Sequence, residues 1–527
     1  MAFTNSVSTS TVFIDLATFS EPEGFIYGGP KAITWFVRGV QKSNWFSFIP
    51  VVLRNEGTHD FGAQHASVSV NRSGDYVLNV WFRAQIPHVY LNIKTNPDYP
   101  IAEPNPGVWA GRSKIAWTRN LMHNLFSHIS ITFNELTVQE FDNYFLDANA
   151  RFGLPASKQV GYNNMIGDIQ AMTTFKVGGN PTVPAAGPVP PPDGPYLSPP
   201  ELLGTGGWFQ VPLPFWFTLD SGVALPIAAL PFNDVKINYT FRRWQELIIL
   251  ESKQSVQNIG TPGVPVYKDV PLSSINDIFT WENGAFTNME PHLGRPGTWV
   301  HYAVVHNDER VKMGDAPRDM LIKQTQTIGR RALTDLTSAT SQDLRLSHSI
   351  YSFYFMSQNI SILQLNDAGG EWSNYTTEAP LMGDTNYGVD PLAQASLKYE
   401  STLRVVLGAD YYSLIVPYYY SNAIPESTGY HMYSYALNSF LYNPSGSTNY
   451  SKLANVSLDY VPSMAAINSA GVGPGTNGVA LRSRGGPLDW WQRGADTNFP
   501  QSYVGIFIAN NWNIARVANG SLGHPTL

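Results

Sequence analysis

The sequence predicts an all-β protein with two large domains. Many short stretches alternate apolar and polar residues, which is the pattern of strands with one buried face. Clusters of Gly, Pro, Asn and Ser separate these stretches, as is typical of β-sandwiches and barrels. The chain has 527 residues, which is too long for one ordinary core. We therefore expect two sandwich-like domains with long loops and few short helices.

The predicted strands follow one another along the whole chain. Residues 67–86 predict a hairpin, and residues 125–141 predict a second one with its turn at Asn134 and Glu135. Further strands are expected in residues 235–244 and 298–307, and in the second half in MLIKQTQTI, HSIYSFYFMSQNISIL, DYYSLIVPYYY, YHMYSYAL and YVGIFIANNWN.

Residues 211–232 are almost wholly apolar, with Asp220 as their only charge. Four prolines and a central turn signal exclude a membrane-spanning helix, because each proline removes a backbone donor and clashes with a helical turn. Residues 209–217 instead alternate, which predicts a strand, and its prolines place that strand at an edge or a bulge. Trp216 lies on the face opposite the Phe209 to Phe217 core row, so we expect it at a contact between subunits.

The domain boundaries are predicted from charge and proline content. The densest charge cluster covers residues 307–320 and lies between strand-rich halves. We expect an N-terminal arm at 1–26, a first domain at 27–306, a linker at 307–318 and a second domain at 319–527. Residues 181–200 contain nine prolines and belong either to a linker or to a long loop near 170–207 that projects outward. A second long loop is expected at 467–487.

Composition restricts the classes of partner. Charged residues make up only 14% of the chain and aromatic residues 13%, a balance found in the cores of subunit interfaces. The net charge of -7 argues against direct binding to nucleic acid. No cysteine is present, so disulfides, thiolate nucleophiles and cysteine-ligated zinc are excluded. The first residues have no signal-peptide pattern, which predicts folding in the cytoplasm.

The motifs of enzymes are weak or missing. Residues 473–478 match G-x-G-x-x-G, but neither a preceding strand nor a following helix frames them, so we interpret them as a loop. The pairs His123 with His128 and His301 with His306 are five residues apart, which places the rings on opposite faces of a strand. We expect no catalytic residue, cofactor or metal. Glycosylation sequons occur at Asn71, Asn238, Asn359, Asn374, Asn449, Asn455 and Asn519, and chance explains most of them.

Several distinctive blocks are spread along nearly the whole chain: FIDLAT and YGG near the start, RSGDYVLNVW at 72–81, WTRNLMHN at 117–124, GYNNMIG at 161–167, LPFWFTLDSGVALPIAALPFNDVKI at 213–237, SGSTNY at 445–450 and NGSLG at 519–523. Together, and in this order, these blocks resemble the major capsid proteins of nucleocytoplasmic large DNA viruses, especially the iridovirus-like branch. The proline-rich segment departs from the family pattern, so the virus species and the shape of the outer surface stay open.

The resemblance implies two consecutive eight-stranded antiparallel jelly-roll sandwiches in each chain. It further implies a homotrimer whose six sandwiches form a pseudo-hexagonal capsomer in the icosahedral outer shell of a virion assembled in the host cytoplasm. The implied partners are neighbouring capsomers, minor capsid proteins and a penton protein, with an inner viral membrane nearby. In the family, the arm faces the inside of the shell, and Phe13, Ile14, Leu16 and Phe19 offer an apolar anchor there.

Two other readings stay open at this point. A β-sandwich protein that binds or cleaves carbohydrate would have aromatic platforms beside a pair of converging carboxylates in one groove. A viral or bacterial adhesin would need a secretion route or a tail-like assembly region, and neither is visible.

Overall fold

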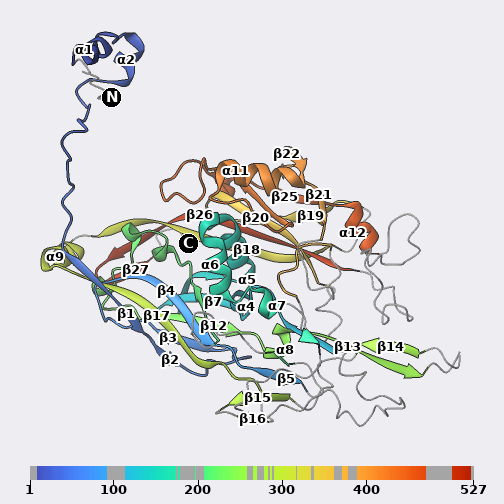
Figure 1. The fold of residues 1–527 in the computed structure, drawn as a ribbon. Helices are drawn as coiled ribbons and strands as arrows, with labels where there is room; N and C mark the ends of the chain where they lie inside the picture. Colours follow the sequence, from blue (N-terminus) through green and yellow to red (C-terminus); the bar gives the residue numbers. More distant parts are fainter. Residues whose placement is uncertain are drawn as a thin grey trace, which may run out of the picture. The chain divides into compact units, whose positions relative to one another are not determined.

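The chain is described by a computed structural model (Figure 1). It divides into two compact units, Met1–Trp45 and Phe46–Leu527. The described residues are 9–91, 113–173, 207–257, 290–315, 317–333, 338–360, 371–377, 388–470 and 501–523, with short strands at 176–177, 196–197, 265–269, 278–282 and 285–287. The G-x-G-x-x-G match and most of the proline-rich loop lie outside the described residues, as does the greater part of the loop predicted at 467–487.

A first sandwich is built from two facing antiparallel sheets. One sheet has the order β1 (Phe46–Val52), β17 (Gly294–Val305), β4 (Tyr76–Gln85) and β11 (Trp208–Pro212). The other has the order β2 (Arg54–Glu56), β3 (Ala66–Ser69), β12 (Val235–Phe241), β7 (Phe126–Phe133) and β8 (Leu136–Phe141). The short strand β2 pairs antiparallel with β3 at the edge of its sheet, and the other eight strands have the order of a jelly roll.

A second sandwich repeats this order. Its first sheet contains β18 (Arg318–Leu333), β26 (Tyr503–Ala518), β20 (Ser349–Asn359) and β23 (Tyr430–Ser434), and its second contains β19 (Thr340–Asp343), β25 (Val456–Pro462), β21 (Leu392–Tyr399) and β22 (Thr402–Gly408). In both sandwiches the first, eighth, third and sixth strands form one sheet, and the second, seventh, fourth and fifth form the other. The predicted all-β class with two consecutive jelly rolls is therefore confirmed.

The remaining elements are short. Two small sheets contain β10 (Tyr196–Leu197), β5 (Val89–Leu91), β15 (Ile278–Glu282) and β16 (Ala285–Thr287), and β14 (Pro265–Asp269), β13 (Ile248–Gln257), β6 (Ser113–Trp117) and β9 (Lys176–Val177). Two further strands are β24 (Thr448–Asn449) and β27 (Ser521–Gly523). The helices outside the strand connections discussed below are α1 (Thr9–Ala17), α2 (Glu21–Ile26), α4 (Leu121–Asn124), α7 (Gln170–Thr173), α8 (Trp244–Leu247), η9 (Tyr450–Lys452) and α12 (Met464–Ser469). None of the described helices is long and apolar enough to cross a membrane.

The alternation of apolar and polar residues that predicted the strands arises because one face of each such strand is buried. In β12, Val235, Ile237, Tyr239 and Phe241 are each at most 2% exposed and point into the core, while the residues between them are half-buried. A strand with one buried face can therefore be predicted from its own sequence.

Residues 67–86 do not form the predicted hairpin, because β3 pairs with β2 and β12 whereas β4 pairs with β17 and β11 in the facing sheet. One predicted strand is also wrong. Residues 410–420 form a π-helical turn, η8 (Tyr411–Ile415), followed by α11 (Val416–Tyr420). The buried side chains include Tyr412 and Val416, which are four residues apart as on a helix, and Pro417 lies at the start of α11 directly after the π-helical turn. Aromatic and β-branched residues suggested a strand, but packing decided otherwise.

The stretch 211–232 is also more irregular than predicted. Strand β11 ends at Pro212, and three short 3₁₀ turns follow, η2 (Trp216–Thr218), η3 (Ser221–Val223) and η4 (Ile227–Ala229). The expected core row is right, because Phe209, Val211, Leu213, Phe215 and Phe217 are all nearly fully buried. The prolines that exclude a long helix also end the strand early.

A charged helix, α9 (Asn307–Asp315), follows the last strand of the first sandwich and precedes the first strand of the second. Arg310 on this helix donates two hydrogen bonds of 2.9 Å to the carboxylate of Asp75 in the first sandwich. The exact limits of the domains stay a prediction.

Candidate functional site

The two sandwiches of the described chain meet along a buried surface, where side chains of both share one core cluster. In the first sandwich, α5 (Asn143–Gly153) and α6 (Ala156–Ile166) occupy the connection between β8 and β11. Asp142 caps α5, since its side chain accepts a hydrogen bond from the backbone N–H of Phe145 at 3.0 Å. This helix lies against the second sandwich, and we call the contact the joint.

Strand β20 forms the other side of the joint. The phenol of Tyr144 on α5 donates to Oε1 of Gln358 at 3.1 Å, and the ring of Phe152 stacks on Tyr354 with centroids 5.2 Å apart. Tyr354 and Met356 belong to a core cluster shared with the first sandwich, whereas Phe353 belongs to the separate core of the second. Both faces of β20 are therefore buried, one in each core.

Strand β18 reinforces the joint along β8. Met320 and Ile322 are 3% and 0% exposed and join the same shared core cluster. The side-chain amide of Gln324 donates to the carbonyl of Val138 on β8 at 2.9 Å. The first strand of the second sandwich thus packs against the fifth strand of the first.

Residues 371–376 insert into the joint from the second half of the chain. The guanidinium of Arg242 lies 3.9 Å from the ring centroid of Trp372, and the indole N–H of Trp372 donates to the carbonyl of Glu246 at 2.8 Å. Ser373 and Tyr375 both donate to one carboxylate oxygen of Asp147, at 2.7 and 3.0 Å. Such a satisfied polar network specifies one arrangement of the two sandwiches.

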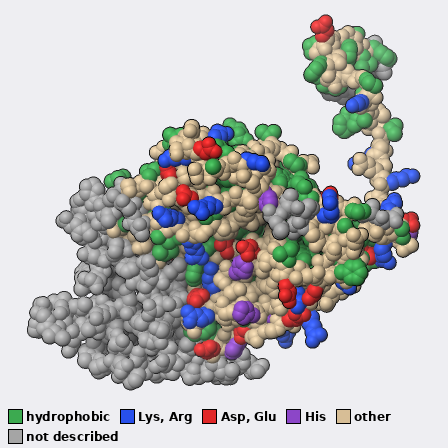
Figure 2. All heavy atoms as spheres, turned by 180° about the vertical axis from the view of Figure 1, so that it is seen from behind, with side chains coloured by type: hydrophobic (Ala, Val, Ile, Leu, Met, Phe, Trp, Pro, Cys, Tyr) green, Lys and Arg blue, Asp and Glu red, His purple; other side chains and the backbone are tan. Residues whose placement is uncertain are grey.

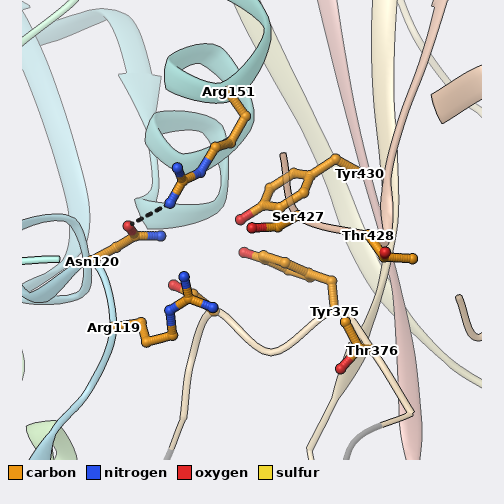
Figure 3. Close-up of a pocket in the computed structure, with 9 residues that line it drawn as sticks. Arg119, Asn120, Arg151, Tyr375, Thr376, Ser427, Thr428 and Tyr430 are labelled. Atoms are coloured by element: carbon orange, nitrogen blue, oxygen red, sulfur yellow. Dashed lines mark hydrogen bonds between the residues drawn. The ribbon is translucent and has the colours of Figure 1, made fainter. Parts of the chain in front are cut away.

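Figure 3 shows a small cavity in this joint, where Arg119 and Arg151 face Tyr375 and Tyr430 across the two sandwiches. It is lined by Arg119, Asn120, Arg151, Ser373, Tyr375, Thr376, Ser427, Thr428 and Tyr430, and its volume of about 10 Å³ is room for about one water molecule. A cavity of this size does not hold a sugar or a cofactor.

Asp168 pairs with both arginines of the cavity. It accepts from Arg151 at 2.9 Å and from Arg119 at 3.4 Å. Burial alone raises the pKa of Asp168, but the two guanidinium groups outweigh burial and leave this pKa below its ordinary value.

The pKa of Glu371, in contrast to that of Asp168, is raised. Its carboxylate accepts from the backbone N–H of Arg119 at 3.3 Å. Burial raises its pKa from 4.5 to about 7, even though the positive charge of Arg119 acts to lower it. Glu371 therefore titrates near neutral pH inside the joint.

Trp216 is not at a subunit contact, and this part of the sequence prediction is wrong. Its side chain is 0% exposed, belongs to the core of its own chain and packs edge-on against Phe217 at 5.4 Å. Because the strand ends at Pro212 and a 3₁₀ turn follows, the alternation that placed Trp216 on an outer face does not continue to it.

The predicted anchor of the arm lies in the unit Met1–Trp45. Its side chains are largely exposed within the single chain: Phe13 70%, Ile14 64%, Leu16 69% and Phe19 61%. These apolar groups are available to a partner, and their role stays a prediction.

The sequons divide by exposure. Asn359 and Asn374 are 2% and 1% exposed, and the amide of Asn359 donates to the carbonyl of Thr376 and to Gln501, so neither is an acceptor in the folded chain. Asn238 is half-buried, and Asn71, Asn449, Asn455 and Asn519 are exposed.

The histidine pairs do not converge on a metal. His123 pairs with Asp147 at 2.6 Å, whereas His128 lies 3.6 Å from Glu140 on the neighbouring strand. The ring of His301 packs on Trp81, and His306 lies near Asp308. Within the described part of the chain, no group of three or more His, Asp and Glu is placed to hold a metal ion.

On the face shown in Figure 2, acidic and basic side chains are intermixed, with apolar side chains between them. Large apolar side chains are exposed on β1 and β22 in particular, among them Phe46, Phe48, Leu403 and Leu407. Surfaces of this kind mark contacts with other proteins.

Solved structures share this architecture. A chain of the PBCV-1 virus capsid superposes with a TM-score of 0.62 at 16% identity, over 94% of this chain and 100% of that chain. The Faustovirus major capsid protein superposes with a TM-score of 0.58 at 12% identity, over 97% of each chain. The chain thus has the double jelly-roll fold of viral capsid proteins.

Sequence comparison gives the family. A model of the major capsid protein N-terminus matches residues 34–276, and a model of the large eukaryotic DNA virus major capsid protein matches residues 309–484. The major capsid protein of Costelytra zealandica iridescent virus is 41% identical over 99% of this chain and 100% of its own length. That of Lymphocystis disease virus 1 is 36% identical over 99% of this chain and 98% of its own. The chain belongs to the major capsid protein family of large eukaryotic DNA viruses, and its role is structural.

The residues of the joint were missed by sequence reasoning. Residues 143–153 do contain a helix signal, because Asp142 is a good N-cap and Tyr144, Asp147 and Arg151 recur at helical spacing. No signal indicated that this helix meets residues more than 200 positions further along the chain.

Proposed function

We propose that three copies of this chain form a capsomer of six sandwiches with a pseudo-hexagonal outline, and that these capsomers tile the icosahedral outer shell of the virion. One observation carries the proposal: two sandwiches of identical strand order are held side by side by a buried joint within one chain. Three such pairs supply six equivalent bodies, which is the number that a hexagonal outline requires. Closed cyclic assemblies are the rule for soluble homo-oligomers.

The partners of the capsomer follow from its place in the shell. Neighbouring capsomers contact its sides, a penton protein closes the vertices, and minor capsid proteins lie beneath it, near an inner viral membrane. The arm reaches these inner partners through Phe13, Ile14, Leu16 and Phe19, which are exposed within the single chain. Synthesis and assembly take place in the host cytoplasm, and the chain has no catalytic activity.

The test is the state of the purified protein. Size-exclusion chromatography with light scattering is expected to give a mass of three chains, and electron microscopy is expected to show particles of hexagonal outline that pack into arrays. A stable monomer that binds or cleaves glycans would contradict the proposal and support the carbohydrate reading. The water-sized cavity in the joint offers that reading no support.

A further inference from the structure

The small cavity in the joint is bounded from both sandwiches by groups that donate hydrogen bonds (Figure 3). Arg119 and Asn120 lie directly before α4, and Arg151 lies on α5. Tyr430 is the first residue of β23, and Tyr375 belongs to the inserted segment 371–376. The side chain of Arg119 is 19% exposed, and the other four residues are at most 5% exposed. Polar groups buried to this degree need their hydrogen-bond partners at the cavity itself.

Three of these residues have donors for which the described part of the chain supplies no acceptor. Arg119 donates through Nε to Asp168 at 3.4 Å, and within the described chain its two Nη atoms make no hydrogen bond. Asn120 accepts from Arg151 through Oδ1 at 3.3 Å, which leaves its Nδ2 group without an acceptor among the described residues. The same holds for the hydroxyl of Tyr430. A guanidinium and an amide nitrogen can only donate, so these groups cannot satisfy one another.

The carboxylates near the cavity already have partners. Asp168 accepts from both guanidinium groups. Asp147 does not line the cavity, and both of its oxygens accept hydrogen bonds from other residues of the joint. Glu371 accepts from the backbone N–H of Arg119, and because burial raises its pKa to about 7, it carries little charge below neutral pH. The two guanidinium groups therefore share Asp168 as their one side-chain carboxylate partner in the described chain.

We propose that this cavity binds a monatomic anion, chloride, which bridges the two sandwiches of one chain. Chloride accepts hydrogen bonds from Arg119, Asn120 and Tyr430 at the same time. A water molecule has two lone pairs and also needs acceptors for its own hydrogens, so it fits this set of donors less well. Chloride is close to water in size, whereas phosphate and sulfate exceed a volume of about 10 Å³.

The bound anion is expected to stabilise the joint. Arg119 and Asn120 come from the first sandwich and Tyr430 from the second, so the full set of donors exists only while the joint is closed. A ligand that binds only the folded state stabilises it by mass action. Thr428 lies at the cavity and is exposed, which gives the ion a path from solvent. The site lies within one chain, so it does not depend on whether the capsomer forms.

Thermal unfolding of the full chain tests the site. Sodium gluconate is replaced stepwise by sodium chloride at constant ionic strength and at about pH 6, where Glu371 is largely protonated. Chloride is expected to raise the melting temperature by roughly 2 °C or more and to reach a plateau, because one site saturates. Gluconate is too large for the cavity and gives the baseline.

Two variants and a control assign the effect to the cavity. Asn120→Asp replaces the amide donor by a carboxylate that pairs with the guanidinium groups itself, so its melting temperature is expected to be independent of chloride. Tyr430→Phe removes one donor to the anion and is expected to weaken chloride binding by roughly tenfold. Tyr442→Phe is the control, because its hydroxyl is also buried without a partner in the described chain but does not line the cavity. It is expected to respond to chloride as the parent does.

Crystals soaked in sodium bromide give a direct readout, since bromide replaces chloride and scatters anomalously. One anomalous peak is expected between Arg119 and Tyr430, and it should be missing from crystals of Asn120→Asp.

Each of the other outcomes overturns the proposal. Identical melting curves in chloride and gluconate mean that the cavity holds water. A chloride effect that persists in Asn120→Asp is a general salt effect, and if that variant does not fold, an undiminished effect in Tyr430→Phe decides in the same way. A bromide peak without chloride-dependent stability means binding at crystal concentration only.

Discussion

Glu371 is a carboxyl group buried in the joint, with its pKa raised from 4.5 to about 7. Because the raised pKa means that the folded chain prefers the protonated form, the stabilising contribution of this group is complete below about pH 4.5 and is lost as the pH rises through about 7. Glu371→Gln removes this dependence. We expect the variant to be more stable than the parent by about 2–3 kcal/mol at pH 8 and nearly equal to it at pH 4.5.

Thermal unfolding at the two pH values checks this prediction. The matched control is Glu246→Gln, which changes a partly exposed carboxylate paired with Arg243 at 3.2 Å. An equal shift for Glu371→Gln at both pH values would contradict the assignment.

Trp216 gives a second test at the residue scale. The Trp216 side chain is fully buried, and burying an unpaired carboxylate there costs more free energy than the folded state has to spare. Trp216→Glu is therefore expected to abolish soluble folded protein rather than to release folded monomers. Trp216→Phe is the control: the indole N–H has no hydrogen-bond partner, so only packing volume is lost, at about 1–2 kcal/mol. Solubility and circular dichroism report the difference, and a folded monomer of Trp216→Glu would restore the interface interpretation.

Among the elements, most strands were predictable from the sequence, including β20, but the elements that pack against them were not. Strand β12 was predicted correctly because only one of its faces is covered by the other sheet. Strand β20 buries nearly every residue from Ile350 to Asn359, so its position in the joint has no alternating signature. The segment 410–420 carries strand-forming residues yet is helical, since its buried positions are four residues apart. A local sequence pattern does not show which elements from distant parts of the chain will bury a residue.

The arm is the element whose function is most directly tested by deletion. Removing residues 1–20 takes away α1 and Phe13, Ile14, Leu16 and Phe19, none of which is buried within the chain. We expect the capsomer to form with unchanged thermal stability, while assembly of shells with the minor proteins is impaired. Light scattering measures the first result and electron microscopy the second. Normal shells from the shortened chain would show that the arm is not an assembly element.

At the scale of the whole molecule, the two sandwiches share one core cluster that contains Phe82 and Leu213 of the first and Tyr354 and Ile508 of the second. Unfolding one sandwich exposes the side of the joint that belongs to the other, so the two are expected to unfold together. Scanning calorimetry of the unit 46–527 should show one transition. Two well-separated transitions would mean that the joint contributes little to stability.

Helix α9 and the joint have a consequence for the thermodynamics of shell formation. Two sandwiches made as separate chains lose translational and rotational freedom each time one of them associates, at an estimated cost of about 4–15 kcal/mol per event. Because α9 tethers the pair, the contact between them forms at the high effective concentration of an intramolecular step, during folding. Any ring built from this chain therefore forms half of its contacts between sandwiches before two molecules ever meet.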